Sequence, residues 1–218
     1  MEVIDKGVLI KKGAEADIYL GYYFGFKSIF KIRIPKSYRD PRFDQYIRRR
    51  RTILEARALR SAHEIGIPTP TVLDVDVENT TLIIEYLDGP TLKELLTQDT
   101  SSSIHFNIIG EYIGKLHSHG MYHGDLTTSN IIVSSDGRPY LIDFGLSGYS
   151  MDIEDYAIDI HLMLRTLEST HFNILDEAYR LFVKGYTNIV GSNMMNKVLR
   201  RVKEIRARGR YVEERVKV

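Results

Sequence analysis

Cysteine is absent from the 218-residue sequence, and so is any long apolar run. Without cysteine the chain can form neither disulfide bonds nor thiolate zinc sites, and it is compatible with a reducing compartment. No stretch approaches the roughly 20 apolar residues of a membrane span, and the start, MEVIDKGVLIKKG, has no small-residue cleavage site. We therefore expect a cytoplasmic protein that is neither secreted nor embedded in a membrane.

A strong overall charge is also missing, because the formal net charge is +1. The charge is unevenly distributed: residues 48–51 are four consecutive arginines, and the tail at 197–218 is rich in Lys and Arg. By itself, such a run indicates a solvated helix face more often than a nucleic-acid site. With 43% hydrophobic and 27% charged residues, the composition is that of a folded protein with one large or two small domains.

The first part of the chain is rich in predicted strands. Residues 8–23 contain two β-rich runs around a Gly-Ala-Glu-Ala turn, and residues 28–36 alternate Phe30, Ile32 and Ile34 with Lys31 and Arg33. Apolar residues then recur at helical spacing, which predicts an amphipathic helix over 44–65 that includes Ile47, Leu54, Ala58, Leu59 and Ala62. Two further runs, 72–77 and 81–87, have the pattern of a hairpin.

The remainder is predicted to be mostly helical, after a hinge at Asp88-Gly89-Pro90. One strand pair, 131–133 with 140–143, interrupts the helices. We therefore expect an α+β chain with two lobes, a strand-rich one with a long helix at 1–87 and a mostly helical one at 88–218. The expected helices of the second lobe cover residues 91–97, 104–119, 153–169, 173–190 and 193–208.

The strongest chemical signal is HGDLTTSN, residues 123–130, followed by a strand, a turn and LIDFG, residues 141–145. Phosphoryl transfer needs a carboxylate to receive the proton of an attacking hydroxyl, and oxygen ligands for magnesium on the phosphates. We assign Asp125 as the base or nucleophile-orienting group, and Asn130 and Asp143 as metal ligands, with His123 as a scaffold residue. A lone Asp in a loop is more often a turn or cap residue, so the joint pattern carries the assignment.

These two loops resemble the catalytic and metal-binding loops of the protein-kinase superfamily. The resemblance implies a minimal two-lobed protein-kinase-like fold that binds ATP and Mg²⁺ between its lobes. It also implies an ion pair between a strand lysine and a helix glutamate, for which Lys31 and Glu55 are the candidates. Lys27 is in phase with Lys31 and is the rival, and Glu55 could instead pair with Arg51 one helical turn away.

The loop expected to cover the phosphates, with Gly13 and Ala14, departs from the kinase pattern, because only Gly13 of the usual three glycines is present. Glu15 also adds a negative charge, which opposes phosphate binding. The resemblance further implies main-chain contacts to adenine from Glu85 to Leu87.

Longer strings resemble a narrower group, the PRPK family, which is the kinase subunit of the KEOPS complex. They include GAEADIY, FKIRIPKSYRDP, RRRTILEARAL, HGDLTTSNIIV and EDYAIDIHLMLR, in the family's order across nearly the whole chain. Asp40 and Tyr156 stand where relatives are expected to have histidine and lysine, which affects details of surface contact. There is no long activation segment or Ala-Pro-Glu anchor after Gly145, and Thr127 replaces the lysine that many protein kinases carry after the base.

The family resemblance implies an atypical Ser/Thr kinase or ATPase that supports threonylcarbamoyl-adenosine modification of tRNA. It favours ATP hydrolysis or autophosphorylation over broad peptide phosphorylation. The implied partners are a threonylcarbamoyl transferase subunit, other KEOPS subunits, and tRNA. The tRNA would be bound through a basic tail formed by Lys203, Arg206, Arg208 and Arg210.

Three alternatives remain open from the sequence. A small-molecule kinase of the aminoglycoside or choline type also uses an HGD loop, but this chain is compact for that class. A RIO-type kinase is the second, and the third is a pseudokinase scaffold, against which the intact set of Lys31, Glu55, Asp125, Asn130 and Asp143 argues.

Overall fold

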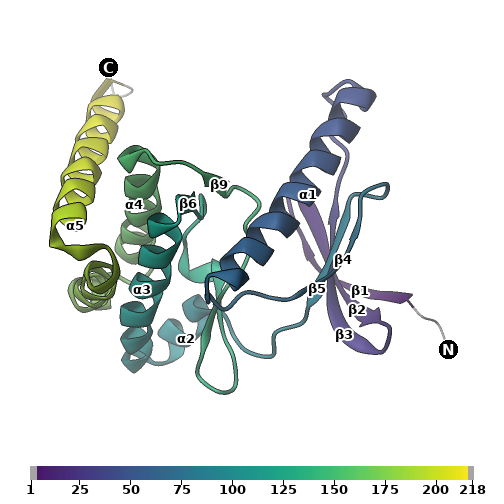
Figure 1. Ribbon diagram of the computed structural model, residues 1–218, viewed down its shortest axis with the longest axis horizontal. Helices are drawn as coiled ribbons and strands as arrows, with labels where there is room; N and C mark the ends of the chain where they lie inside the picture. The colour runs from purple at the N-terminus through teal and green to yellow at the C-terminus, as the bar shows by residue number, and fades with distance from the viewer. Residues whose placement is uncertain (1–3, 216–218) are drawn as a thin grey trace. The chain divides into compact units, whose positions relative to one another are not determined.

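The chain forms two compact units, Met1–Asp88 and Gly89–Val218, in the computed structural model (Figure 1). The structure describes the backbone of residues 4–215 and the side chains of residues 4–208. The sequence-based boundary, between residues 87 and 88, lies one residue before the observed one. Among the described residues, no helix combines the length and the apolar character that crossing a membrane demands.

The N-terminal unit is built on an antiparallel sheet with the strand order β1-β2-β3-β5-β4. Its strands are β1 (Ile4–Lys12), β2 (Ala16–Tyr23), β3 (Phe26–Arg33), β4 (Val72–Asp76) and β5 (Thr81–Glu85). The helix α1 (Pro41–Glu64) begins three residues before its predicted start. Asp40 explains this start: its carboxylate accepts hydrogen bonds from the main-chain nitrogens of Arg42 and Phe43, at 3.0 and 3.1 Å, and so caps the helix.

The buried face of α1 is more polar than its apolar spacing predicts. Asp44, Thr52 and Glu55 are buried together with apolar residues, whereas Leu54, expected on that face, is 47% exposed. The prediction for Leu54 was wrong because charged side chains of β3 and of the loop after it pair with α1. Asp44 and Glu55 are the partners of these side chains on the helix, and their position sets which face of α1 is buried.

The C-terminal unit contains four α-helices among the described residues. They are α2 (Leu92–Gln98), α3 (His105–Ser118), α4 (Ile153–Thr170) and α5 (Leu175–Arg215). Two short antiparallel pairs lie between α3 and α4: β6 (Met121–Tyr122) with β9 (Gly148–Tyr149), and β7 (Ile131–Val133) with β8 (Pro139–Leu141). Strand β8 ends before Asp143, which the sequence placed at the strand's last position.

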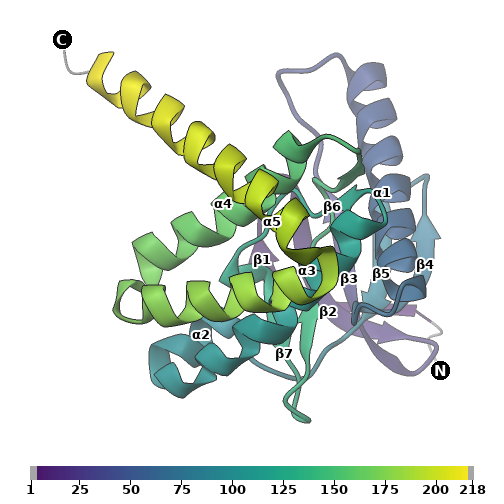
Figure 2. The ribbon, with the colours of Figure 1, turned by 60° about the vertical axis from the view of Figure 1, so that its left-hand side comes forward.

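Helix α5 changes direction at Gly191, where the backbone is not helical (φ 78°, ψ 160°) (Figure 2). The two segments on either side correspond to the two helices predicted over 173–190 and 193–208. Glycine adopts this left-handed φ without the steric cost that a Cβ imposes.

Helices α3 and α5 approach each other closely through glycine. A Cβ on Gly110 of α3 would lie 2.1 Å from the carbonyl oxygen of Phe182. A Cβ on Gly185 of α5 would lie 1.8 Å from that of Asn107. Buried side chains of both helices, among them Phe106, Ile113, Phe182 and Tyr186, form much of the core of this unit.

Candidate active site

Asp125 and Asn130 are joined directly in the loop between β6 and β7. The Asn130 Nδ2 group donates a hydrogen bond to Asp125 Oδ2 at 2.8 Å and another to the Asp125 carbonyl oxygen at 2.9 Å. Because both bonds use the amide nitrogen, they fix the orientation of the amide and direct its Oδ1 atom away from Asp125. The turn of 3₁₀-helix η2 (Thr128–Asn130) brings the two residues together.

His123 ties this loop to the segment that carries Asp143. Its ring is fully buried, its Nε2 lies 3.1 Å from the Ile142 carbonyl oxygen, and its ring centroid lies 4.7 Å from that of Phe144. The Asp125 main-chain nitrogen is 3.3 Å from His123 Nδ1. A single neutral tautomer with the proton on Nε2 satisfies both contacts, so His123 has the scaffold position that the sequence predicts.

Asp143 comes directly after Ile142, whose main chain is hydrogen-bonded to Asn130. The Ile142 nitrogen donates to the Asn130 carbonyl oxygen at 3.0 Å, which places Asp143 one residue beyond that contact. Asp143 is exposed and has a positive φ of 61°, a conformation in which Asp and Asn are enriched among non-glycine residues. The Gly145 nitrogen lies 3.3 Å from its Oδ1 atom.

Asp159 of α4 is a supporting residue that the sequence interpretation missed. Its buried carboxylate accepts hydrogen bonds from the main-chain nitrogens of His123 and Gly124, at 2.6 and 2.7 Å. His117 Nε2 lies 3.3 Å from the same group, and His117 Nδ1 lies 2.8 Å from the Tyr186 hydroxyl. A signal was present in the sequence, because Asp159 is the one carboxylate in phase with Tyr156, Ile160 and Met163 on the apolar face of a predicted helix.

Tyr156 corrects one expectation about surface contacts. The residue is 1% exposed, its ring stacks on His117 at a centroid distance of 4.3 Å, and its hydroxyl donates to the Ser150 carbonyl oxygen at 2.7 Å. A difference from relatives at this position therefore changes the core next to Asp159 and not the surface. Burial raises the pKa of the Tyr156 hydroxyl.

A second buried contact, from the end of α4, holds the loop formed by residues 123–130. His171 Nε2 lies 3.1 Å from the Thr128 hydroxyl, and both side chains are buried. Burial, and to a lesser degree the nearby charge of Lys93, lowers the pKa of His171. The neutral imidazole is therefore the form that fits this position.

The donor set of the loop fits a magnesium ion. Asn130 and Asp143 offer oxygen donors, which this hard cation prefers. Within the described residues, no group of three or more His, Cys, Asp or Glu side chains is placed to hold a metal ion. Mg²⁺ is usually held by one or two protein oxygens together with the phosphates of a substrate, and Asn130 and Asp143 would supply that number.

In the N-terminal unit, Lys31 and Glu55 form the ion pair that the sequence predicts. Lys31 Nζ lies 2.6 Å from Glu55 Oε1, and the side chains are 11% and 2% exposed. The rival Lys27 instead lies over the Tyr86 ring, 3.8 Å from its centroid. Arg51, the alternative partner of Glu55, pairs with Glu15 at 2.8 Å.

Arg33 is the second residue that the sequence interpretation missed. Its Nη2 atom lies 2.6 Å from Glu55 Oε2, so the glutamate is contacted by one cation on each oxygen. The signal in the sequence was the period of two, which puts Lys31 and Arg33 on the same face of β3.

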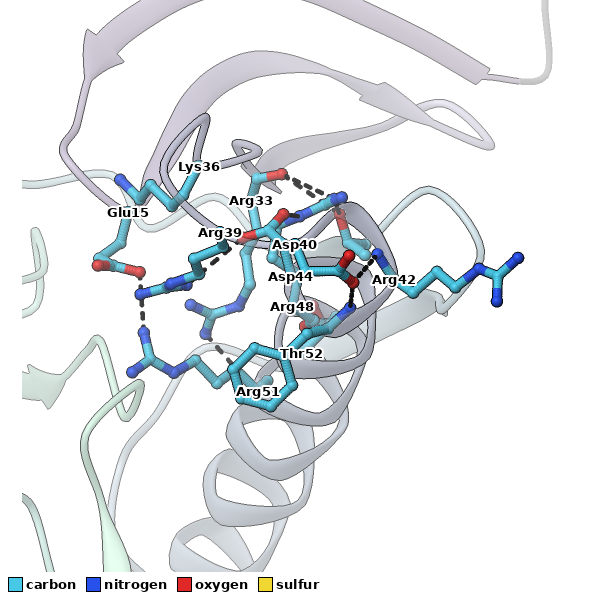
Figure 3. Close-up of polar contacts among 12 residues, drawn as sticks. Glu15, Arg33, Lys36, Arg39, Asp40, Arg42, Asp44, Arg48, Arg51 and Thr52 are labelled. Atoms are coloured by element: carbon cyan, nitrogen blue, oxygen red, sulfur yellow. Dashed lines mark hydrogen bonds and ion pairs between the residues drawn. The ribbon is translucent and has the colours of Figure 1, made fainter.

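The turn between β1 and β2 is held by several contacts. One of them pairs the Glu15 carboxylate, whose charge was expected to oppose phosphate binding, with an arginine. The Arg51 guanidinium pairs with the Glu15 carboxylate (Figure 3). Lys36 Nζ donates to the Ala14 carbonyl oxygen, and the Ile34 nitrogen donates to the Glu15 carbonyl oxygen at 3.2 Å. Gly13 is required here, because a Cβ would lie 2.4 Å from the Ala16 carbonyl oxygen.

Next to this turn, Arg39 and Arg48 both pair with Asp44, at 3.4 and 2.7 Å (Figure 3). The hydrogen bond from Arg48 is the main reason that the pKa of Asp44 lies below its ordinary value.

Of the two residues expected at adenine, Glu85 already donates its main-chain nitrogen to the Thr71 carbonyl oxygen at 2.9 Å, so its main-chain carbonyl is the group that could contact adenine. Leu87 is buried and follows the end of β5.

The basic tail is partly neutralised within its own unit. Arg206 pairs with Glu168 at 2.7 Å, and Arg208 pairs with Glu154 at 3.2 Å. Lys203 is exposed. The side chain of Arg210, the fourth predicted tail residue, lies outside the described residues.

The chain is similar to known proteins in sequence and in fold. The RIO domain family matches residues 23–155. The KEOPS complex subunit Bud32 of Pyrococcus abyssi is 43% identical over 214 residues, covering 94% of this chain and 96% of the relative. A probable bifunctional tRNA threonylcarbamoyladenosine biosynthesis protein of Methanococcus vannielii is 42% identical, and this chain spans only 36% of its length.

Among solved structures, the Rio2 kinase from Chaetomium thermophilum matches with a TM-score of 0.64 and 20% identity, covering 96% of this chain and 74% of that one. This likeness shows a kinase fold. The RIO-type alternative and the narrower resemblance are thus compatible, since both matches fall on the same chain. The chain belongs to the RIO domain family and, more narrowly, to the family of the KEOPS complex subunit Bud32.

Proposed function

We propose that this protein is a Mg²⁺- and ATP-dependent phosphotransferase and ATPase that works as the kinase subunit of a KEOPS complex in threonylcarbamoyl-adenosine modification of tRNA. One observation carries the proposal: 43% identity, over nearly the full length of both chains, to the Bud32 subunit of Pyrococcus abyssi. The names of the bifunctional relatives connect the same domain with tRNA threonylcarbamoyladenosine biosynthesis.

The proposed roles divide between the base, the magnesium ligands and the groups that contact the nucleotide. Asp125 orients the attacking hydroxyl or water and accepts its proton, and Asn130 keeps the Asp125 carboxylate in place through Nδ2. Asn130 Oδ1 and Asp143 would hold magnesium, which supplies charge neutralisation on the terminal phosphates when bound. Lys31, oriented by Glu55, contacts the α- and β-phosphates. Gly13 and Ala14 face the phosphates with their main chain, and Glu85 and Leu87 contact adenine.

ATP hydrolysis or autophosphorylation is favoured over broad peptide phosphorylation. After Asp143, the chain reaches α4 at Ile153, and the short strand β9 in between pairs with β6. This segment is too short to add the platform on which protein kinases bind a peptide. Thr127 also stands where many protein kinases have a lysine near the base.

The proposed partners are a threonylcarbamoyl transferase subunit, the other KEOPS subunits, and tRNA bound through the basic tail, in the cytoplasm. Lysine and arginine side chains in the tail would contact tRNA phosphates without reading the sequence.

The test is ATP turnover by the purified protein with its partner subunit and tRNA, at varied Mg²⁺. We expect Mg²⁺-dependent phosphate release that Asp143→Asn abolishes while the circular dichroism spectrum stays unchanged. Asp176→Asn, at an exposed position in the first turn of α5, is the matched control and should keep full turnover. Absence of Mg²⁺-dependent turnover in the wild-type complex would refute the proposal.

If turnover is absent, nucleotide binding separates a scaffold from a misassigned site. A ligand present at a hundred times its dissociation constant stabilises the folded state by about 2.7 kcal/mol. A thermal shift with Mg²⁺-ATP but no turnover would indicate a pseudokinase scaffold. No shift at all would indicate that the site residues are wrongly assigned.

A further inference from the structure

Glu55 is shared by two cations that come from one strand. Lys31 Nζ and Arg33 Nη2 each lie 2.6 Å from a different oxygen of its carboxylate. The Glu55 side chain is 2% exposed and that of Arg33 is 5% exposed. A carboxylate buried to this degree needs partners on both oxygens, because an unsatisfied buried charge is strongly destabilising.

Arg33 is itself fixed at several points. Its main-chain nitrogen donates to the Thr80 carbonyl oxygen at 3.1 Å, and its carbonyl oxygen accepts from the Thr80 hydroxyl at 3.3 Å. Its Nη2 atom also reaches the Arg51 carbonyl oxygen of α1 at 3.5 Å (Figure 3). Ala16, its cross-strand neighbour on β2, is small enough to leave room for the guanidinium.

The two cations differ in how well each can define a geometry. Lysine has a compact charge on a flexible stem, whereas the guanidinium of arginine is planar and its donors have fixed directions. With Arg33 on Oε2, the rotation of the Glu55 carboxylate is set, and Oε1 is presented to Lys31. A glutamate with lysine as its sole partner would be free to turn about its terminal bond.

We propose that Arg33 is a positioning residue, which orients Glu55 and through it Lys31. The role of Lys31 toward ATP phosphates rests on the proposed function, but the orienting effect of Arg33 does not. Arg33 thereby fastens α1 to β3 through a contact separate from the Lys31–Glu55 pair.

The first experiment measures geometry and needs no turnover. A crystal structure of the Arg33→Met protein without nucleotide should show the plane of the Glu55 carboxylate turned about its terminal bond, so that no oxygen keeps its position 2.6 Å from Lys31 Nζ. Arg33→Lys should keep Glu55 in place, because it restores a cation on Oε2. A Glu55 carboxylate that keeps its orientation, still 2.6 Å from Lys31 Nζ, in the Arg33→Met protein would overturn the proposal.

The second experiment measures ATP binding and turnover in matched variants. Arg33→Met should lower kcat/KM for ATP by about 10- to 100-fold, as is typical when a supporting contact of a site residue is removed. Arg57→Met is the control. Arg57 is an exposed arginine of α1, the helix that carries Glu55, and its replacement should change kcat/KM less than twofold.

A double variant separates positioning from a general structural role. If Arg33 acts through Glu55, Arg33→Met combined with Glu55→Gln should be no worse than Glu55→Gln alone. Losses that multiply would refute the positioning role. A melting temperature for each variant identifies any that fails to fold, and Arg33→Lys, which should recover most of kcat/KM, keeps the test decisive in that case. An inactive wild-type protein would contradict the proposed function, while the crystal structure would still decide the role of Arg33.

Discussion

Asn130 donates two hydrogen bonds to Asp125, one to its carboxylate and one to its carbonyl oxygen. Asn130 thus holds the proposed base, and in the proposed function its Oδ1 atom would also bind the metal. We predict that Asp125→Asn lowers kcat by about 10²- to 10⁴-fold, the usual contribution of a general base. This corresponds to about 3–5 kcal/mol of activation free energy.

Asn130→Ala should have a different kinetic signature. Loss of a metal ligand should raise the Mg²⁺ concentration needed for half-maximal turnover, in addition to lowering kcat. Ser129→Ala, at an exposed position of the same loop, is the control and should leave both quantities unchanged. An Asn130→Ala protein with wild-type Mg²⁺ dependence would contradict the assignment of Asn130 as a ligand.

The contact between Asp125 and Asn130 could be predicted because the candidate residues are close in sequence, while their catalytic roles stay predictions. Asp125, Asn130 and Asp143 lie within 19 residues, and one strand pair connects them. Lys31 and Glu55 could be paired because an alternating strand and a helix offered few candidates. Asp159 and Arg33 were missed for a common reason: the period of a helix or strand shows the face on which each residue lies, but not the distant segment that it contacts.

The face of α1 was also misjudged in part, and for a physical reason. Apolar spacing placed Leu54 inward, but Leu54 is exposed, because the ion pairs of Glu55 with Arg33 and of Asp44 with Arg39 come from outside the helix and bury a different face. The hydrophobic pattern alone cannot report buried charges that are satisfied by another segment.

The glycine contacts between α3 and α5 give a prediction on stability. In an open helix position, Gly→Ala stabilises by about 1 kcal/mol. At Gly185 the new Cβ would lie 1.8 Å from the Asn107 carbonyl oxygen, so the helices must move apart. We expect Gly185→Ala to destabilise the protein by about 1–3 kcal/mol, as overpacking usually does.

Urea unfolding followed by circular dichroism measures this change. Lys184→Ala, at the adjacent exposed position of α5, is the control and should change the free energy of unfolding by less than about 0.5 kcal/mol. A stabilised Gly185→Ala protein would show that the helices are not in close contact there.

The buried His171 predicts a dependence of stability on pH. Burial lowers its pKa below the ordinary value of 6.5, so below that pH the unfolded chain binds a proton more readily than the folded one. The contribution of neutral His171 to stability is therefore complete above pH 6.5. It is lost as the pH falls from 6.5 toward the lower pKa of the folded state.

We expect urea midpoints to fall between pH 7.5 and pH 5.5, and His171→Asn to make this fall less steep. His161 also has a lowered pKa, mainly from burial, and its buried Nδ1 atom has no hydrogen-bond partner among the described residues. His161→Asn should therefore reduce the slope as well, whereas only His171→Asn should also lower turnover through Thr128. An unchanged slope in the His171→Asn protein would contradict the buried neutral imidazole.

The ion pairs of the basic tail make its proposed contact with tRNA testable in two directions. Deleting the residues after Lys203, or replacing Lys203, Arg206, Arg208 and Arg210 by Gln, should lower tRNA affinity. Either change should also flatten the salt dependence, since each lost phosphate contact lowers the slope of log K against log salt by about 0.7 to 0.9.

The opposite change should follow from removing the carboxylates that compete with tRNA. Glu168 and Glu154 pair with Arg206 and Arg208, so the double variant Glu154→Gln, Glu168→Gln should release both arginines and raise tRNA affinity at low salt. Glu177→Gln, an exposed change in the first turn of α5, removes a carboxylate that has no ion-pair partner among the described side chains of the tail, and it serves as the control. Filter binding of tRNA at several salt concentrations measures all variants. Equal affinities and equal slopes for the deletion and the wild type would refute a tRNA contact by the tail.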